Sequence, residues 1–325
     1  MSKQTARPEA GWSAVQTAAA LILCRAAAFF CAAQPYSAAC AKGMFTAALL
    51  TAGLLLPLLI APQTPLPDAL LPLYRLFALL WASLTLTRLY ALLTALHSPY
   101  PVLTLFLLIP VLLEMQRLPQ AAAARAGSLL LFVTAAAFLL LPVSGIRTAN
   151  SLYLYTPDSA GAAFLREFQQ CGELGLLPLL RRRETVPLAA SRGAAAWLTV
   201  RAAVLPLTVL FGTMQNGRLL HLTGNPFFLL LARTPLSDAL RTDGIWMLLA
   251  VASTVLCLTV FLHFAAESAA PRLRYGLFLP FCGFAVLFAA VPECAAVPAI
   301  AALLLGIGVP VLLRLRQALL LRRSE

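Results

Sequence analysis

The sequence predicts an all-α, polytopic membrane protein, and three observations lead to this prediction. Of its 325 residues, 61% are hydrophobic and only 11% are charged, and the mean hydropathy is +0.87. A soluble globular chain is nearer half apolar and a quarter charged, so the excess apolar side chains must face lipid. The apolar residues also form long continuous runs, whereas a membrane barrel requires alternating segments of about ten residues. A soluble enzyme, a nucleic-acid-binding protein and a disordered tail are therefore excluded.

Ten stretches are candidates for spanning helices, which need about 20 mostly apolar residues to cross about 30 Å of hydrocarbon. They lie roughly at 14–33, 44–62, 69–96, 99–115, 124–143, 160–180, 194–214, 243–266, 275–292 and 295–314. Because the connections are short, we expect a single integral membrane domain. Its parts are a tail at 1–13, five helices within 14–143, five within 160–314 and a basic tail at 315–325.

The loops predict the orientation, because cytoplasmic loops of membrane proteins are rich in Lys and Arg. With ten spans and a cytoplasmic N-terminus, fourteen of the 24 Lys and Arg residues lie in cytoplasmic segments and five in external ones. We therefore expect both termini to face the cytoplasm. This bias also explains the net charge of +12 without nucleic acid. Arg25 interrupts the first apolar run, so we expect a retained first span rather than a cleaved signal peptide.

No pattern in the sequence indicates catalysis or a bound metal. The seven cysteines are scattered and form no C-x-x-C pair, so neither a zinc site nor a disulfide framework is indicated. The sequence also lacks a phosphate-binding Gly-rich loop, a nucleophile elbow and an H-E-x-x-H motif. We therefore expect the protein not to be an enzyme and to need no cofactor or metal.

Charged residues within the predicted spans point to a functional interior, because charges at membrane depth are costly and usually face a bundle interior or a cavity. Arg25 in the first span and Glu173 in the sixth each lie several residues from the nearest interface. Arg75 and Arg201 either extend to the headgroups or face the interior. We expect Arg25 to pair with Glu173, in a structural or a gating role, which would remove two unpaired charges from the interior at once.

The sixth span is a poor continuous helix, because residues 165–178 contain two glycines, a proline and several polar side chains. Such a stretch is tolerated where neighbouring helices or a water-filled cavity satisfy the backbone. In transporters built from inverted repeats, broken helices near the midplane form the substrate site. Ten spans divide into five and five, which places the first and sixth in corresponding positions. We therefore expect a 5+5 inverted-repeat, transporter-like fold with broken first and sixth helices.

The candidate site combines these charges with nearby polar residues. Gln169 and Gln170 are expected to line a pocket, whereas the hydroxyl groups of the eighth span either line it or bond their own backbone. Arg88 and Asp243 lie near interfaces and are expected to fix helix ends or act in gating. The candidate ligand-binding residues are Arg25, Gln169, Gln170, Gly172, Glu173, Ser253 and Thr254.

Several stretches, in order, carry a likeness to a known family. They are 73–77 with 87–90 in the third span, 101–142, 168–180 around Cys171-Gly172-Glu173, and 228–247 with Arg241-Thr242-Asp243. From about residue 70 to 290 the chain resembles the spore germination permeases. These are the B subunits of nutrient germinant receptors and distant members of the amino acid–polyamine–organocation transporter superfamily. The chain departs from them at the first helix, where Cys24-Arg25-Ala26-Ala27 replaces the usual glycine or serine.

The resemblance implies a small-molecule sensor in the inner membrane of a bacterial endospore, acting with a larger A subunit and a lipoprotein C subunit. A nutrient such as an amino acid would bind between the first, third, sixth and eighth helices and favour one of two conformations. Two other functions stay open. Fold alone does not separate a sensor from a secondary transporter for an amino acid or amine, and an arginine in the pocket is consistent with a protein that only scaffolds a complex.

Overall fold

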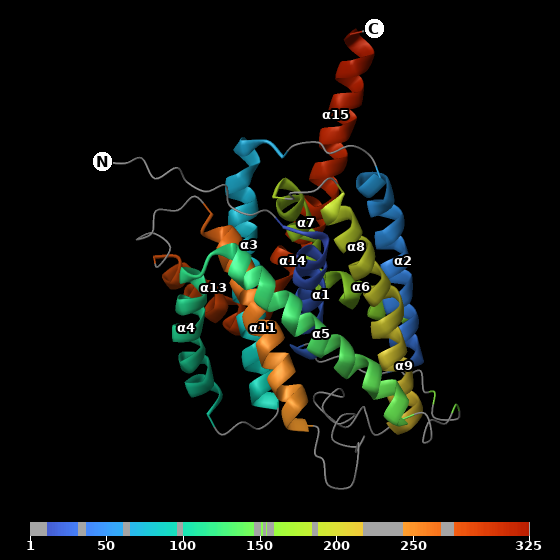
Figure 1. Ribbon diagram of the computed structural model, residues 1–325, viewed down its shortest axis with the longest axis vertical. Helices are drawn as coiled ribbons and strands as arrows, with labels where there is room; N and C mark the ends of the chain where they lie inside the picture. Colours follow the sequence, from blue (N-terminus) through green and yellow to red (C-terminus); the bar gives the residue numbers. More distant parts are fainter. Residues whose placement is uncertain are drawn as a thin grey trace.

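The computed structural model describes residues 12–31, 37–60, 66–95, 100–145, 151, 154, 159–183, 188–216, 243–267 and 276–324, with the backbone alone at 60, 139–145, 216, 243–245 and 321–324. Every regular element of these residues is a helix, as predicted (Figure 1). Helices long and apolar enough to cross a membrane are Ala14–Cys31, Ala38–Leu59, Asp68–Ala95, Gln120–Phe138, Ala189–Gln215, Trp246–Ala265 and Pro292–Leu320. The chain is a multi-pass membrane protein.

The first half of the chain follows the predicted ranges closely. It contains α1 (Ala14–Cys31), α2 (Ala38–Ile60), the short η1 (Asp68–Leu70), α3 (Leu71–Ala95), α4 (Pro101–Arg117) and α5 (Gln120–Gly145). The largest difference is in α2, which begins at Ala38 rather than near residue 44. In Figure 1, α5 crosses the face of the bundle obliquely, and it packs against α1, α9 and α11.

The second half contains shorter helices and more interruptions. The helices are α6 (Ala160–Gln169), α7 (Glu173–Arg182), α8 (Ala189–Thr199), η3 (Val200–Val204), α9 (Leu205–Asn216), α11 (Asp243–Ala265), α13 (Phe278–Ala290), η5 (Pro292–Ala295), α14 (Ala296–Leu303), η6 (Leu304–Gly308) and α15 (Val309–Ser324). The sixth predicted span is divided into α6 and α7, as expected. The basic tail predicted at 315–325 is helical up to Ser324 and projects beyond the bundle (Figure 1).

The central element is α1, which packs against α3, α5, α7, α8 and α11 and is buried along most of its length. It contains neither Gly nor Pro and is rich in alanine, the strongest helix former. The prediction of a break in this helix is wrong, because α1 continues without interruption through Arg25. Its small side chains also allow close packing: Gly193 of α8 lies so near that an added Cβ would stand 2.8 Å from the backbone nitrogen of Ala18.

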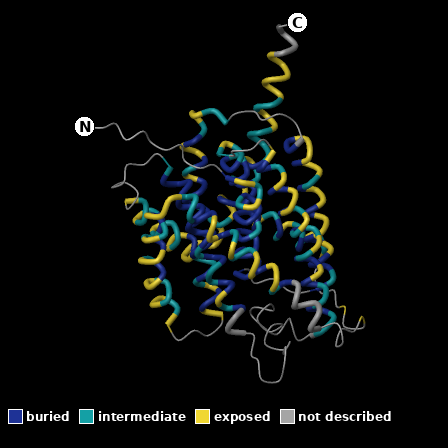
Figure 2. Tube along the Cα trace, in the orientation of Figure 1, coloured by how far each residue is buried: buried dark blue, intermediate teal, exposed yellow. Residues whose placement is uncertain are grey.

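Exposed apolar side chains lie mainly on the outer helices. Figure 2 shows exposed stretches along α4, α5 and α15, whereas the centre is buried. Phe106 and Leu107 of α4 and Leu129 and Phe132 of α5 are all more than half exposed. A soluble protein rarely exposes contiguous apolar surface on this scale. These faces are therefore suited to contact with lipid.

Arginines gather at the end of the bundle where α7 ends and α15 projects, which lies uppermost in Figure 1. We call it the basic end, and it includes Arg181, Arg182, Arg183, Arg314 and Arg316. Arg183 connects three elements there. Its carbonyl accepts a hydrogen bond from the backbone nitrogen of Trp12 (2.9 Å), its Nη1 donates to Oε1 of Gln120 (2.7 Å), and its Nη2 pairs with Oε1 of Glu267 (2.6 Å). The start of α1, the start of α5 and the end of α11 therefore meet at the same end, as the predicted order of the spans requires.

Two π-helical segments interrupt otherwise regular helices. η3 lies between α8 and α9, and η6 lies between α14 and α15. A π-segment shifts the backbone hydrogen bonds by one residue and occurs often at functional sites. In η6 the carbonyl of Leu305 accepts a hydrogen bond from the hydroxyl of Tyr74 on α3 (2.6 Å). Gly306 stands against α7, where an added Cβ would lie 2.6 Å from the carbonyl oxygen of Leu174.

Candidate functional site: a buried charge cluster at a helix break

The break between α6 and α7 lies in the middle of the bundle. Only residues 170–172 separate the two helices, and three-residue turns close around them, with Gln170 N donating to the carbonyl of Glu167 and Leu174 N to that of Cys171. Each helix has ten residues, which is about 15 Å at 1.5 Å per residue. The break is therefore about half a bilayer away from either end.

One carboxylate at the break holds two arginines. Oε2 of Glu167 on α6 contacts Nη2 of Arg25 on α1, and Oε1 of Glu167 lies 3.0 Å from Nε of Arg201 in η3. All three side chains are fully buried. Arg25 was expected to pair with Glu173, but the structure pairs it with Glu167.

The backbone of the break also takes part in the cluster. A broken helix leaves carbonyl oxygens without their usual helical donors. Nη1 of Arg25 donates to the carbonyl of Gln170 (3.2 Å), and Nη2 of Arg201 lies 2.7 Å from Sγ of Cys171. That thiol in turn donates to the carbonyl of Glu167 (2.8 Å). The two arginines therefore contact the broken segment through its backbone and the Cys171 thiol as well as through Glu167.

The position of Arg201 depends on its local structure. It lies in the π-segment η3, and its guanidinium group stands over two aromatic rings, 5.4 Å from the centroid of Trp197 and 5.9 Å from that of Phe168. Cation–π contacts of this kind gain strength where the cation is desolvated. The sequence left open whether Arg75 and Arg201 extend to the headgroups or face the interior. In the structure Arg201 faces the interior, while Arg75 is half-buried.

Glu173 is the first residue of α7, where the helix dipole favours a negative charge. Its side chain is only 1% exposed, and its Oε1 has no hydrogen-bond partner among the described residues. The cluster also holds two unpartnered donors, Nε of Arg25 and Nη1 of Arg201. Buried polar atoms are nearly always hydrogen-bonded. An acceptor and two donors without partners among the described residues therefore lie at or beside this helix break.

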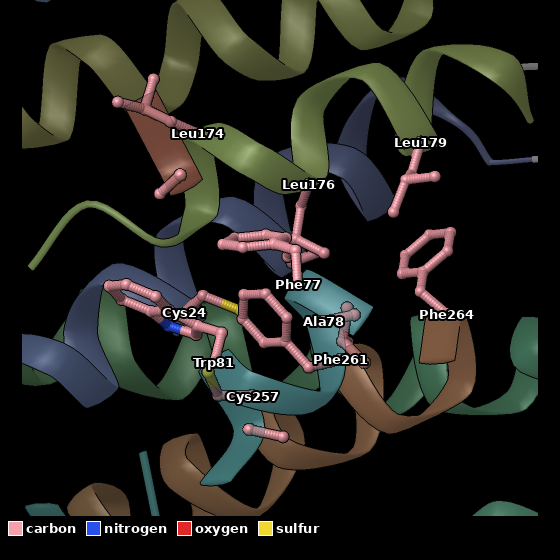
Figure 3. Packing of buried hydrophobic residues seen from close by; sticks show 14 of the residues in the cluster. Cys24, Phe77, Ala78, Trp81, Leu174, Leu176, Leu179, Cys257, Phe261 and Phe264 are labelled. Carbon is pink, nitrogen blue, oxygen red and sulfur yellow. The ribbon is translucent and has the colours of Figure 1, made fainter. Parts of the chain in front are cut away.

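Aromatic side chains cover the other side of the break. The Trp81 indole lies so close to Gly172 that an added Cβ would overlap it. Figure 3 shows Trp81 and Phe77 of α3 beside Phe261 of α11, with Leu174 of α7 nearby, and the Trp81 and Phe261 ring centroids are 6.3 Å apart. A glycine at position 172 is therefore required by this packing.

Arg88 links α3 to the same break. Its guanidinium group lies 5.3 Å from the centroid of the Trp81 ring, and its Nη2 donates to the carbonyl of Gln169 (3.1 Å). Arg88 is half-buried, whereas the side chain of Gln169 is exposed and that of Gln170 is buried. With ionised carboxylates, Arg25 and Arg201 balance Glu167 and Glu173, and Arg88 adds one positive charge beside them.

The remaining predicted site residues lie on α11. Thr254 bonds its own helix through the carbonyl of Ala250 (2.7 Å) and lies 3.5 Å from Sγ of Cys31, while Oγ of the buried Ser253 has no partner among the described residues. Asp243 is the first residue of α11, and its side chain lies outside the described residues. The described residues contain no group of three or more metal-ligating side chains.

Sequence reasoning missed Glu167, Cys171, Arg201 and Trp81 as members of this site. The sequence did offer a signal for Glu167, because it is one of two acidic residues in the sixth span and arginines at membrane depth require a nearby carboxylate. Nothing in the sequence marks Trp81 as the residue above Gly172. No protein-family description, curated protein or solved structure matches this chain.

Proposed function

We propose that this protein is a membrane receptor subunit of the spore germination permease type, which binds a small nutrient at the α6–α7 break and passes the signal to partner subunits. The observation that carries the proposal is the buried Glu173 carboxylate, whose Oε1 has no partner at a helix break in mid-bundle. We also propose a 5+5 fold of about ten spanning helices, with α1 and the α6–α7 pair in corresponding positions.

The packing around the break supports this proposal. The helices expected to enclose the ligand, the first, third, sixth and eighth of the predicted spans, are α1, α3, α6–α7 and α11. One continuous hydrophobic cluster contains Cys24, Trp81, Leu174 and Phe261, one residue from each of them (Figure 3). Helices that form a common ligand site must pack together in this way.

The chemistry of the unpartnered atoms favours an amino acid as the ligand. Oε1 of Glu173 can accept hydrogen bonds from an ammonium group, while Nε of Arg25 and Nη1 of Arg201 can donate to a carboxylate. Trp81 covers Gly172, so a ligand that enters at the break would have to displace the ring. A ligand that binds more tightly when the ring has moved shifts the protein toward the other state, and only such differential affinity can transmit a signal.

A germination assay tests the proposal. Spores that lack the gene should lose the response to one nutrient in a panel of single amino acids and sugars, and the intact gene should restore it. Glu173→Gln should assemble but fail to restore the response, because it removes the charge without changing the shape. Glu114→Gln is the matched control, since Glu114 forms an exposed pair with Arg117. Normal germination of the deletion strain on every nutrient would contradict the receptor function.

A secondary transporter for an amino acid or amine is the second candidate, favoured by the same carboxylate. An intramembrane acidic residue at a broken helix is typical of the ion-coupling and substrate sites of transporters. Radiolabelled amino-acid uptake into proteoliposomes separates the two functions. Uptake that depends on Glu173 would establish transport, and absence of uptake together with nutrient-specific germination would establish sensing. If the protein showed neither uptake nor a nutrient-specific germination response, and if deletion of its gene caused loss of the receptor complex, the protein would be a scaffold.

The resemblance also guides the placement of the protein in the cell. We propose that the basic end faces the cytoplasm, since Lys and Arg are retained on that side. The membrane would be the inner membrane of the spore, with an A-type and a C-type subunit as partners. Affinity purification from spores should recover both subunits, and their absence from a stable preparation would argue against the receptor complex.

A further inference from the structure

A cavity lies at the basic end of the bundle, beside the end of α7 that is opposite to Glu173. Its volume is about 560 Å³, and it is lined by the end of α2, residues 66–68 at the start of η1, the end of α7 and the η6–α15 helix. Its walls include Leu58, Leu177 and Leu313 together with three prolines. The proposed receptor function does not use this cavity.

Three arginines supply the charge of the cavity. Arg181, Arg182 and Arg314 line it, and Asp68 is the single acidic residue in the lining. Nη2 of Arg182 pairs with Oδ1 of Asp68 at 2.8 Å, near the surface. Among the lining residues, three guanidinium groups stand against one carboxylate, and this balance favours an anion over a cation.

Backbone carbonyl groups at the end of α2 hold two of these arginines, Arg181 and Arg314, in place. Nη1 of Arg181 donates to the carbonyl of Leu58 at 2.7 Å, and Nη2 of Arg314 donates to the same carbonyl at 3.1 Å. Arg314 also bonds the carbonyl of Pro57 (2.7 Å), and Arg181 bonds Oγ of Ser191 (3.1 Å). The two guanidinium groups therefore converge on the last turn of α2. Positions fixed in advance reduce the entropy that is lost on binding.

The combination of charge and apolar wall identifies the ligand class. Guanidinium groups match phosphate oxygens in geometry, whereas leucine walls contribute only if the ligand brings hydrocarbon. Basic sites between spanning helices, near their ends, are typical for acidic lipid headgroups. We propose that this cavity binds an anionic phospholipid, with the three arginines around its phosphate and the leucines beside the start of an acyl chain.

The lipid should stabilise the bundle, because the cavity is built from four separate elements. The test uses the purified full-length chain in detergent, with thermal unfolding and native mass spectrometry as readouts. Phosphatidylglycerol should raise the unfolding midpoint and remain bound in the mass spectrum. Phosphatidylcholine, which has no net charge, and glycerol 3-phosphate, which has no acyl chain, should do neither.

Three variants make the test specific. Arg182→Gln should weaken phosphatidylglycerol binding about fivefold, the usual effect of one basic residue near an anionic headgroup, and Asp68→Asn should strengthen it by removing the competing carboxylate. Arg316→Gln is the matched control, because Arg316 is exposed on the same helix as Arg314 but does not line the cavity.

Several results would overturn the proposal. Equal binding of phosphatidylglycerol and phosphatidylcholine would mean ordinary contact with surrounding lipid. Equal effects of Arg182→Gln and Arg316→Gln would mean general attraction to a basic surface, and tight binding of glycerol 3-phosphate would identify a soluble phosphate ligand instead. None of these results bears on the nutrient response of Glu173→Gln, so the two proposals fail independently.

Discussion

The Nε atom of Arg201 lies 3.0 Å from Oε1 of Glu167, and neither side chain is exposed. The other oxygen of the same carboxylate contacts Arg25, so a single side chain of α6 joins α1 to η3. The attraction between buried charges must offset the large cost of removing them from water. This arrangement gives Glu167 a structural contact on both of its oxygens, whereas Oε1 of Glu173, six positions further along the chain, has no partner among the described residues.

We predict that Glu167→Gln strongly destabilises the protein. The amide cannot neutralise either arginine, so both lose their direct ion pair in the low-dielectric interior. Removing one partner of a buried ion pair costs about 3 kcal/mol or more. Thermal unfolding in detergent should show a large fall in the midpoint or a loss of monodisperse protein.

Two other glutamates provide the comparison for this variant. Glu114→Gln should leave the midpoint unchanged, because its pair with Arg117 is exposed. Glu173→Gln should also fold, since Oε1 of Glu173 has no partner to lose. If Glu167→Gln were as stable as Glu114→Gln, the buried pairing would be wrong.

The bond between Tyr74 and Leu305 predicts a second effect. Tyr74→Phe removes the hydroxyl that donates to the carbonyl of the buried Leu305, which should lower the free energy of unfolding by about 1 kcal/mol. Tyr100→Phe is the control, because Tyr100 is 67% exposed. Chemical unfolding in mixed micelles measures both, and an equal effect of the two changes would contradict the bond.

Gly306 and Gly308 form a matched pair within one helix. An added Cβ at Gly306 would press on the backbone of Leu174, whereas at Gly308 the nearest atom is a leucine methyl at 3.9 Å. Gly306→Ala should therefore cost about 1–3 kcal/mol by overpacking, and Gly308→Ala should be neutral or stabilising. The reverse order of the two midpoints would refute the close approach of η6 to α7.

The contact between Gly172 and Trp81 predicts non-additive effects. Gly172→Ala should be destabilising because the new methyl group overlaps the indole. In a Trp81→Ala background the ring is gone, so the same change should cost much less. A double-mutant cycle on unfolding midpoints gives the coupling directly. Additive effects would show that the ring and the glycine are not in contact.

Cysteine labelling tests the proposed orientation. Tyr100 lies at the end of the bundle away from Arg316, and both side chains are exposed. An impermeant maleimide should label Tyr100→Cys on intact cells expressing the protein, but Arg316→Cys only after permeabilisation. The unsubstituted chain is the control for its own cysteines. The opposite labelling would place the basic end outside.

Sequence patterns were sufficient to predict where most helices lie. Continuous apolar runs indicated the helical ranges, and the two glycines and Pro178 with their polar neighbours indicated the break in the sixth span. The predicted break in the first span rested on its correspondence with the sixth span in a 5+5 repeat and on the polar Arg25. It was wrong because Glu167 and the carbonyl of Gln170 satisfy that arginine from the neighbouring helix, so α1 needs no opening of its own backbone.

The pairing inside the site could not be predicted in the same way. Glu167 and Glu173 lie on opposite sides of a break, so their relative direction depends on the turn at residues 170–172 and not on helical periodicity. The π-segments were equally hidden, because 200–204 and 304–308 are composed of residues that ordinary helices also contain. The pairing of Arg25 and Arg201 with Glu167 depends on the turn at residues 170–172 and on the π-segment at 200–204.

The π-segments also determine where the chain tolerates a change of length. An α-helix that loses one residue turns everything beyond the deletion by about 100°, which misplaces each buried face. A π-segment already holds one residue more than the α-helical turn it replaces. Deleting a single residue within 200–204 or 304–308 would therefore yield a regular helix whose flanks keep their faces. Single-residue gaps in related sequences are expected to fall at these two places, and a relative with such a gap at 200–204 would lack the backbone that aims Arg201 at Glu167.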